Sequence, residues 1–331
     1  MRQVNLGIIG LGAWPRQAYV PNLQKISAAN IVAVAAPSQA TRDYAREQFG
    51  PDIATYEDYT ALLADDSIEA VMIAVPNRFH AEIVQAAAQS GKHLFFEPPL
   101  GVTEQEIRAT LAALQQTQGI VQIDHEIRYA PVMGELQRRI ADGAIGDPLM
   151  ARVRLWVDWG FGGTDWLEDV EAQGFFIWLG CWYVDMLDCV FPEVPLRADV
   201  VGGRAMNGEL MDHGWAVLQY PGGRSGAIEF NLINCAGREI SLHVLGTKGE
   251  MSAEAWDGIL RWRTGEAWQE TVVACEQPPH GFAGVYEAIS GFIKAVAEGA
   301  PVVADRDVMR RVHAGAVACS KAEMQNRGAS V

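Results

Sequence analysis

The sequence predicts a two-domain α/β protein whose first domain is a Rossmann-type, doubly wound parallel sheet. Three observations predict this fold. Apolar strand-like runs alternate with helical patterns through the first 125 residues, a glycine turn directly follows the first run, and a chain of 331 residues exceeds what one core usually supports. We therefore expect a dinucleotide-binding domain over residues 1–125 and a second domain over residues 126–331.

The first domain is expected to contain five parallel strands, because helical segments such as Gln39–Phe49 and Ala81–Ser90 separate its apolar runs. Such sheets are covered on both faces and bind ligands at the carboxyl ends of their strands. The expected strands are Val4–Ile9, Ile31–Ala35, Ala70–Val75, His93–Phe96 and Ile120–Ile123.

A glycine turn links the first strand to the first helix. Bare backbone at Gly10 and Gly12 lets a pyrophosphate approach, and the N–H groups at the start of the helix face the anion. We expect these glycines, with Ala13 and Trp14, to contact a nicotinamide dinucleotide; an ordinary strand-to-helix turn is the alternative. Pro15 takes the place of a third glycine, which suits a first helical turn because the missing N–H would be unpaired there.

The end of the second strand carries no acidic residue of the kind that binds the adenosine ribose hydroxyls of NAD. Ser38 and Arg42, helped by Arg16, can instead bind a 2′-phosphate. This pattern favours NADP over NAD. The alternative is that Arg42 is only a solvated helix residue.

Charge and composition exclude several classes of function. The formal net charge of −15 disfavours nucleic acid and anionic membrane surfaces, which are bound by clustered Lys and Arg. The five cysteines are widely spaced and form no Cys-x-x-Cys pair, which argues against a disulfide framework and a zinc site. No apolar run approaches the ~20 residues that a membrane span needs. We expect a cytoplasmic protein that has no metal and acts on a small molecule.

Several blocks of sequence, in order along nearly the whole chain, carry a family resemblance. The run IAVPNRFHAEIVQAAAQSGKHLFFEPPLGVT resembles the signature region of the Gfo/Idh/MocA family, named for glucose-fructose oxidoreductase and inositol dehydrogenase. The later stretches IRYAP, GAIGDP, HVLGTKGEM and FIKAVAEGAPVVADRD are similar to the same family. The resemblance implies an NAD(P)-dependent oxidoreductase, and we expect Pro76, Asn77, His80, Glu97 and Pro98 beside the cofactor. The alternative for His80 is that it caps the following helix.

The resemblance also implies that the second domain is α+β, with a large, open, mainly antiparallel sheet that mediates homo-oligomers. The residues agree with this, because half-buried strand patterns recur through the second half and Pro221-Gly222-Gly223 marks a hairpin turn. The expected strands are Met150–Val157, Trp215–Tyr220, Gly226–Asn231 and Ile240–Leu245.

The sequence departs from the family where the chemistry is expected. Members typically carry Glu-Lys-Pro, whose lysine contacts the nicotinamide ribose and the reacting hydroxyl, but this chain has Glu97-Pro98-Pro99. The family's catalytic histidine corresponds to Trp182, and of that motif only Asp185 remains. Proline has no donor, and an indole N–H cannot act as a general base. Both usual catalytic groups are missing.

Three explanations remain open: an oxidoreductase with a relocated proton donor, a dinucleotide-binding sensor without turnover, and a non-redox enzyme that keeps the cofactor. The candidate replacements for the lost groups, with Asp185, are His125 or Tyr129 as proton donor and Arg128 as a carboxylate clamp. An interdomain salt-bridge network is the structural alternative for each of them.

Aromatic residues gather in the sequence around the expected substrate cleft. Trp178 and Trp182 lie four positions apart and share one helix face, and Trp159 and Phe161 lie shortly before them. Clustered aromatic faces suit a planar ligand or the apolar face of a sugar, so we expect these four residues to bind substrate. The alternative is a domain core or a subunit contact.

Overall fold

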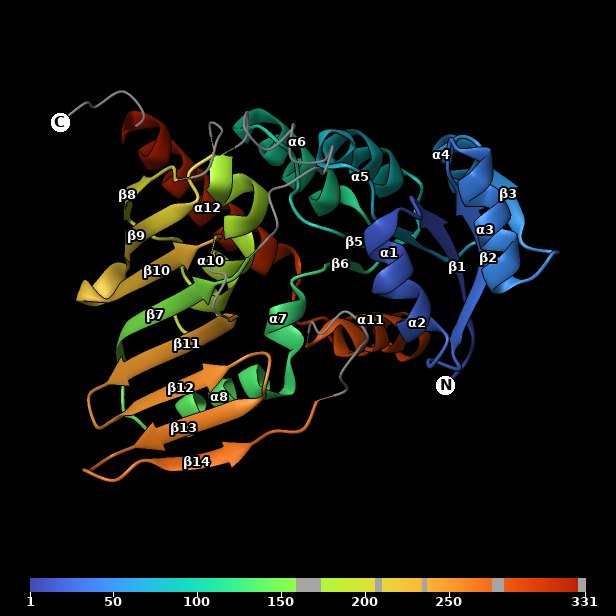
Figure 1. Cartoon of the computed structure of the whole chain (residues 1–331). Helices are drawn as coiled ribbons and strands as arrows, with labels where there is room; N and C mark the ends of the chain where they lie inside the picture. Colours follow the sequence, from blue (N-terminus) through green and yellow to red (C-terminus); the bar gives the residue numbers. More distant parts are fainter. Residues whose placement is uncertain (159–173, 206–209, 234–236, 276–282, 327–331) are drawn as a thin grey trace. The chain divides into compact units, whose positions relative to one another are not determined.

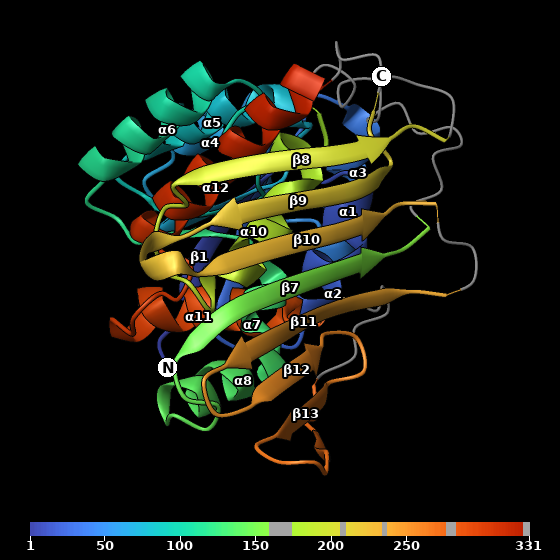
Figure 2. The ribbon, with the colours of Figure 1, turned by 90° about the vertical axis from the view of Figure 1, so that its left-hand side faces the viewer.

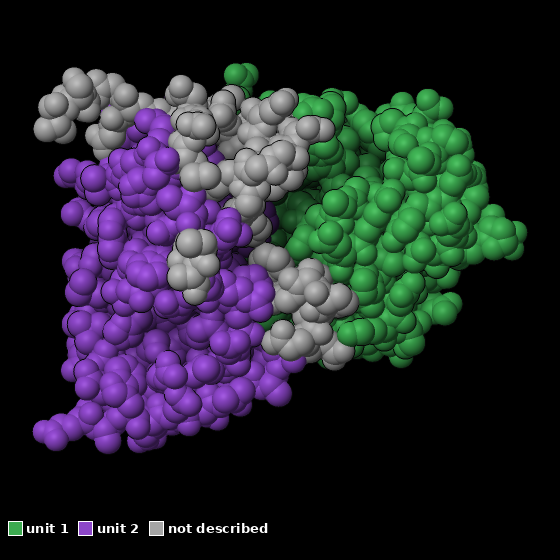
Figure 3. Space-filling model, in the orientation of Figure 1, with its two compact units in different colours: residues 1–126, 277–309 green, residues 127–276, 310–331 purple. Residues whose placement is uncertain are grey.

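The computed structural model describes all residues except 159–173, 206–209, 234–236, 276–282 and 327–331. The chain divides into two compact units (Figure 3). Unit 1 contains residues 1–126 and 277–309, and unit 2 contains residues 127–276 and 310–331. Among the described residues, no helix is long and apolar enough to cross a membrane.

Unit 1 is built on a six-stranded, wholly parallel sheet with the strand order β3-β2-β1-β4-β5-β6 (Figure 1). The four residues of β4 are all buried, as expected for a strand covered on both faces. This confirms the expected Rossmann-type fold. The strands are β1 (Val4–Ile9), β2 (Ala29–Ala35), β3 (Ala54–Tyr56), β4 (Ala70–Ile73), β5 (His93–Phe96) and β6 (Val121–Ile123).

The sequence analysis missed β3, because this strand has three half-buried residues and no apolar run. The expected helix Gln39–Phe49 is confirmed. The helix expected at Ala81–Ser90 begins and ends one residue earlier, at His80–Gln89. The helices of unit 1 are α1 (Ala13–Gln17), α2 (Tyr19–Leu23), α3 (Gln39–Phe49), α4 (Tyr59–Leu63), α5 (His80–Gln89), α6 (Glu104–Gln116) and α11 (Val285–Glu298), with a 3-10 turn at Asn77–Phe79.

Unit 2 contains an eight-stranded sheet with the order β14-β13-β12-β11-β7-β10-β9-β8 (Figure 1 and Figure 2). All neighbouring strands are antiparallel except β7 and β10, so the expected large, mainly antiparallel sheet is confirmed. The strands are β7 (Pro148–Trp156), β8 (Arg197–Gly203), β9 (His213–Gln219), β10 (Ser225–Asn231), β11 (Glu239–Gly246), β12 (Glu250–Glu254), β13 (Ile259–Arg263) and β14 (Gln269–Val272).

One face of this sheet is packed against helices of unit 2. Helix α10 (Cys181–Asp188) contacts β7 and β10, and α8 (Pro131–Ala141) contacts β12 and β13. Burial therefore alternates along the strands: Val153 and Leu155 of β7 are fully buried, whereas Arg152 between Ala151 and Val153 is exposed. The short turn Pro221–Gly223 joins β9 to β10, as expected.

The observed division of the chain differs from the expected boundary in one segment. Residues 277–309, which were assigned to the second domain, cluster with unit 1. The reason is that α11 packs against α2 and β1, and Arg306 donates hydrogen bonds to the carbonyl oxygens of Leu114, Thr117 and Gly119. Helix α7 (Glu126–Tyr129) and helix α12 (Arg306–Asn326) each begin in unit 1 and continue into unit 2.

Candidate functional site

The glycine turn of unit 1 combines one glycine required by packing with one that faces open space. Gly10 has φ +85°, and a Cβ atom there would lie 2.2 Å from the carbonyl oxygen of Ala74, so no larger residue fits. Gly12 is exposed, and a Cβ atom there would meet nothing within 4 Å. The space beside Gly12 is therefore available to a ligand at the carboxyl end of β1.

The first turn of α1 leaves room for an anion. It contains no acidic side chain, and Ala13 is exposed while Pro15 is buried. Arg16 does not point into the turn as a free cation, because its guanidinium donates to the Leu11 carbonyl oxygen and to the Thr41 hydroxyl. These features fit a dinucleotide pyrophosphate bound by backbone N–H groups near Gly12.

At the end of β2, the two residues expected to select the cofactor are placed differently. Ser38 is exposed at the start of α3. The Arg42 guanidinium donates to the carbonyl oxygens of Ala36 and Pro37, at 2.7 and 2.8 Å, and to the side chain of Gln39. Arg42 thus holds the loop after β2 in place, and this contact supports a structural role for it.

The loop after β4 is held by His80, the first residue of α5. The ring of His80 is buried, with Nδ1 2.8 Å from the carbonyl oxygen of Pro99 and Nε2 2.6 Å from that of Val75. Burial lowers the pKa of His80, and the two carbonyl contacts oppose this. His80 therefore links the loop after β4 to the loop after β5, whereas Pro76 is exposed and Asn77 half-buried.

Glu97 follows β5, and its carboxylate accepts hydrogen bonds from two neutral donors. Trp14 Nε1 and the Tyr19 hydroxyl each lie 2.5 Å from Oε1 of Glu97. Burial raises the pKa of Glu97 to about 7, although the bonds from Tyr19 and Trp14 oppose the rise. Pro98, which follows, is buried and supplies neither charge nor donor.

Asp124 follows β6 and is fully buried. Neither carboxylate oxygen of Asp124 receives a hydrogen bond from the residues that the structure describes. Burial and the charges of Glu97 and Glu126 raise the pKa of Asp124 well above its usual value. The sequence analysis did not assign a role to Asp124 or Tyr19, although an acidic residue directly after an apolar strand is a recognisable signal.

The remaining candidates of this segment lie around α7. His125 is fully buried, and its backbone N–H donates to the carbonyl oxygen of Ile123. Tyr129 is half-buried at the end of α7. Neither position settles a role in proton transfer, so both assignments stay predictions.

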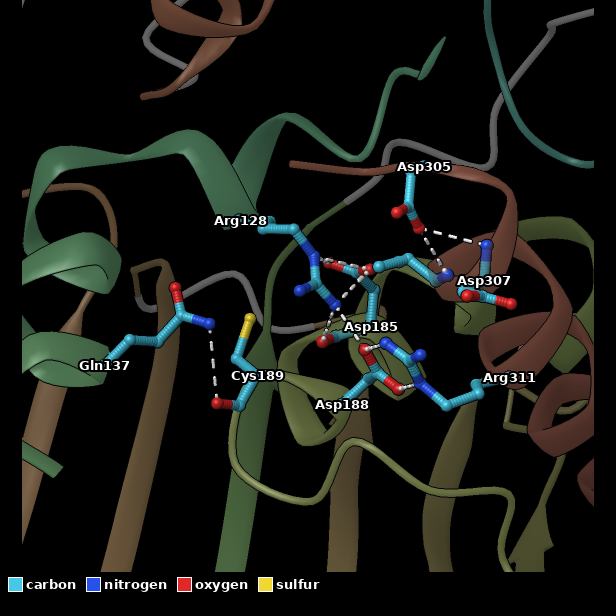
Figure 4. A network of polar contacts seen from close by, with 9 residues as sticks. Arg128, Gln137, Asp185, Asp188, Cys189, Asp305, Asp307 and Arg311 are labelled. Atoms are coloured by element: carbon cyan, nitrogen blue, oxygen red, sulfur yellow. Dashed lines mark hydrogen bonds and ion pairs between the residues drawn. The ribbon is translucent and has the colours of Figure 1, made fainter. Parts of the chain in front are cut away.

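Arg128 and Asp185 form part of a buried ion-pair network in unit 2 (Figure 4). Arg128 Nε lies 2.9 and 3.0 Å from the two carboxylate oxygens of Asp185, and Nη2 lies 2.8 Å from Asp188. Arg311 binds the same Asp188 at 2.6 and 2.9 Å, so both guanidinium groups point toward one carboxylate. Burial alone would lower the pKa of Arg128, but Asp185 and Asp188 raise it well above the usual value.

This network indicates a structural role for Asp185. Its side chain is 1% exposed, and it is compensated by a guanidinium that cannot be deprotonated. Arg128 is equally enclosed, so it is not placed to clamp a free carboxylate. The sequence analysis missed Asp188 and Arg311, which complete the network.

Only part of the expected aromatic site lies in the described residues. Trp178 is buried in the π-helical turn Phe176–Gly180, and Trp182 is half-buried on α10. Trp159 and Phe161 fall outside the described residues. The neighbouring Phe175 is fully buried and stacks on Phe230 with a ring separation of 4.1 Å, which makes it part of the core.

Comparisons with known proteins agree with both units. Residues 4–125 match a Gfo/Idh/MocA family model described as an oxidoreductase family with an NAD-binding Rossmann fold, and residues 133–252 match that family's C-terminal domain. The chain is 24% identical to scyllo-inositol 2-dehydrogenase (NAD(+)) of Bacillus subtilis over 75% of this chain and 73% of the relative. It is 26% identical to levoglucosan dehydrogenase of Pseudarthrobacter phenanthrenivorans, over 76% and 73%.

A third relative, trans-1,2-dihydrobenzene-1,2-diol dehydrogenase of Mus musculus, is 31% identical over 66% of this chain and 65% of its own. Among solved structures, levoglucosan dehydrogenase in complex with NADH and levoglucosan aligns with a TM-score of 0.85 at 20% identity, covering 98% of each chain. A putative myo-inositol dehydrogenase from Sinorhizobium meliloti aligns with a TM-score of 0.83 at 21% identity, again covering 98% of each. These two likenesses concern the fold.

Proposed function

The chain belongs to the Gfo/Idh/MocA oxidoreductase family, and we propose that it transfers a hydride between NAD(P) and a cyclic, sugar-derived or aromatic carbonyl or imine substrate. The observation that carries this proposal is the open turn at Gly12 within a chain that matches both domains of the family. The dinucleotide supplies the hydride when bound. The residues of this chain bind it, orient the substrate and exchange the proton.

The substrate class is supported by two observations. Three relatives are named for inositol, levoglucosan and dihydrobenzenediol, all of which are cyclic molecules with hydroxyl groups. In unit 2, the half-buried Trp182 offers part of an aromatic surface, and aromatic rings pack well against the apolar face of a sugar ring. We therefore propose a ring-shaped polyol or its ketone as substrate.

We propose that NADP binds at least as well as NAD. The loop after β2 carries no carboxylate to repel a 2′-phosphate, and Ser38 is exposed at the start of α3. Fluorescence titration with NADPH and NADH measures this preference directly. A Ser38→Asp variant should bind NADPH more weakly while its affinity for NADH is retained.

A dinucleotide-binding sensor is the second candidate function. Pro98 and Trp182 stand where the family's lysine and histidine are expected, and neither can act as an acid or a base at neutral pH. A sensor binds the dinucleotide and turns nothing over. Binding without turnover would favour it.

The testing experiment is titration of the protein with NADH and NADPH, followed by assays of the reduction of NAD+ and NADP+ with scyllo-inositol, levoglucosan and trans-1,2-dihydrobenzene-1,2-diol. Gly12→Leu should abolish dinucleotide binding, because its side chain would fill the open space beside the turn. Gly265→Leu is the matched control, since a Cβ atom at Gly265 also meets nothing within 4 Å. Unchanged affinity in Gly12→Leu would contradict the assignment of this turn to the cofactor.

We also propose that unit 2 forms homo-oligomers through the open face of its sheet. Trp215 and Val201 are paired across β9 and β8, and both are exposed, at 42% and 66%. Val217, on the same face, is 41% exposed. Large apolar side chains grouped on one face are typical of an interface. Trp215→Glu should lower the mass measured by sedimentation, and an unchanged mass would contradict the proposal.

A further inference from the structure

Two carboxyl groups stand side by side at the carboxyl edge of the parallel sheet in unit 1. Phe96 of β5 pairs with Ile123 of β6, so the next residues, Glu97 and Asp124, leave adjacent strands at the same level. The backbone N–H of Asp124 donates to the carbonyl oxygen of Phe96 at 2.8 Å, which fixes this placement. Ligands of such sheets bind at this edge.

The two carboxyl groups receive very different numbers of hydrogen bonds. Glu97 accepts two short bonds, from Trp14 and Tyr19. Asp124 is 0% exposed, neither of its oxygens has a hydrogen-bond partner of standard geometry among the described residues, and the nearby Tyr19 hydroxyl only partly opposes the rise of its pKa. A buried carboxylate without donors is strongly disfavoured, whereas a neutral carboxyl group can itself donate. A proton placed on Asp124 would remove its buried charge and let its carboxyl group donate to the neighbouring Glu97.

The charges around Glu97 and Asp124 also favour a protonated carboxyl group. The groups that shift the pKa values of Glu97, Asp124 and Tyr19 are one another, Trp14 and the acidic Glu126, and none of them is a cation. Burial raises the pKa values of both carboxyl groups, and the charges of Glu97 and Glu126 raise that of Asp124 further, whereas the hydrogen bonds to Glu97 partly oppose the rise of its own pKa. A buried acid that holds a proton near neutral pH can exchange it in a reaction at that pH.

We propose that Glu97, supported by a protonated Asp124, is the group that exchanges the reaction proton beside the bound dinucleotide. Glu97 is the member that reaches the surface, at 9% exposed against 0% for Asp124. One of its donors, Trp14, belongs to the helix that starts at the glycine turn. Asp124 is a positioning residue, because it acts through Glu97. This inference rests on the proposed oxidoreductase function.

The proposed step balances without a further reactant. When a hydroxyl group is oxidised, its carbon loses a hydride to the dinucleotide and its oxygen loses a proton, which the Glu97 carboxylate accepts. Reduction of the carbonyl returns the same proton from Glu97. The Asp124 proton stays in its hydrogen bond to Glu97 in both directions.

Binding of the dinucleotide should by itself change the protonation of Glu97. The oxidised nicotinamide ring carries a positive charge and the reduced ring does not. A cation near a carboxyl group lowers its pKa. Oxidised dinucleotide should therefore release a fraction of a proton from Glu97 on binding near neutral pH, and reduced dinucleotide should release less.

The first measurement is infrared spectroscopy of the full chain near neutral pH, in the region of the protonated carboxyl C=O stretch. We expect a band to which Asp124 and the protonated fraction of Glu97 both contribute, and which Asp124→Asn weakens. Asp212→Asn is the matched control, because Asp212 is also buried but accepts hydrogen bonds from the backbone N–H of Ala205. A band that persists unchanged in Asp124→Asn would overturn the inference.

The second measurement is the number of protons released when oxidised or reduced dinucleotide binds. Calorimetry in buffers of different ionisation enthalpy gives this number. In Glu97→Gln the difference between the two forms should be lost, while both forms still bind. This variant also serves if Asp124→Asn does not fold. If neither dinucleotide binds the wild-type protein, the proposed function fails; if both bind and Glu97→Gln releases protons as the wild type does, only the inference fails.

Discussion

Each unit buries a group of acidic side chains, but the two groups are compensated in opposite ways. In unit 2, Asp185 and Asp188 bind the guanidinium groups of Arg128 and Arg311. In unit 1, Glu97 accepts hydrogen bonds from the neutral donors Trp14 and Tyr19, and none of the described groups that shift its pKa is a cation. Charge in unit 2 is balanced by cations, whereas charge in unit 1 has to be balanced by protons.

This difference separates a structural cluster from a reactive one. A carboxylate bound to arginine keeps its charge over the whole physiological range, so it cannot exchange protons at neutral pH. A carboxyl pair without a cation changes its protonation near neutral pH. The different compensation therefore favours the proposed acid–base role of Glu97 in unit 1 over the role expected for Asp185 in unit 2.

The largest effect on stability is expected from breaking the ion pairs between the arginines and aspartates of unit 2. Arg128→Met leaves Asp185 without its bidentate partner in a buried site, which should lower the free energy of unfolding by about 3–5 kcal/mol. Urea titration followed by circular dichroism measures this. Arg138→Met is the control: its ion pairs with Glu135 and Asp142 are on the surface, and no measurable change is expected. Equal losses in the two variants would remove the distinction drawn for unit 2.

The raised pKa of Glu97 in unit 1 should affect the pH dependence of the free energy of unfolding. The folded protein holds the Glu97 proton up to a pKa of about 7, while the unfolded chain releases it near the ordinary glutamate pKa of 4.5. Stability is therefore lost as pH rises across this interval, by roughly 3 kcal/mol for the full shift. Glu97→Gln should flatten this part of the profile, as measured by thermal unfolding at a series of pH values.

Glu69 provides a control of opposite sign. Hydrogen bonds from Asn5 and Arg2 outweigh burial and lower the pKa of Glu69 in the folded state. Its contribution is present above the unfolded pKa and is lost as pH falls through the folded one. Glu69→Gln should therefore weaken the protein at neutral pH. If Glu97→Gln behaved in the same way, the raised pKa of Glu97 would be contradicted.

The sequence was sufficient to predict those elements that form from a local pattern of residues. Continuous apolar runs predicted five strands of unit 1, and the glycine turn predicted the open space beside Gly12. The strand β3 was missed because its three residues are only half-buried. The return of residues 277–309 to unit 1 was missed because it depends on contacts with α2 and β1, which lie far away in the sequence.

The site was less predictable, because its chemistry depends on partners that spacing does not reveal. The position of Asp185 on a helix was correctly read, but Arg128 lies 57 positions away from it and Arg311 lies 123 positions from Asp188. The acid pair is equally hidden: adjacent strands bring Glu97 and Asp124 together, although helix α6 separates them in the sequence. Periodicity shows which face is buried and does not show which charges meet there.

The smallest effect is expected from removing one of the neutral donors that bind Glu97, and it tests how these donors control the pKa of Glu97. Trp14→Phe removes one of the two hydrogen bonds to Glu97, which should cost about 2 kcal/mol of stability. Because that bond holds the pKa of Glu97 down, its loss should move the infrared titration of the carboxyl group to higher pH. Trp268→Phe is the control, since Trp268 is exposed and contacts Arg263 in unit 2. A midpoint that Trp14→Phe leaves in place would mean that burial alone sets the protonation of Glu97, and that the helix after the glycine turn does not tune it.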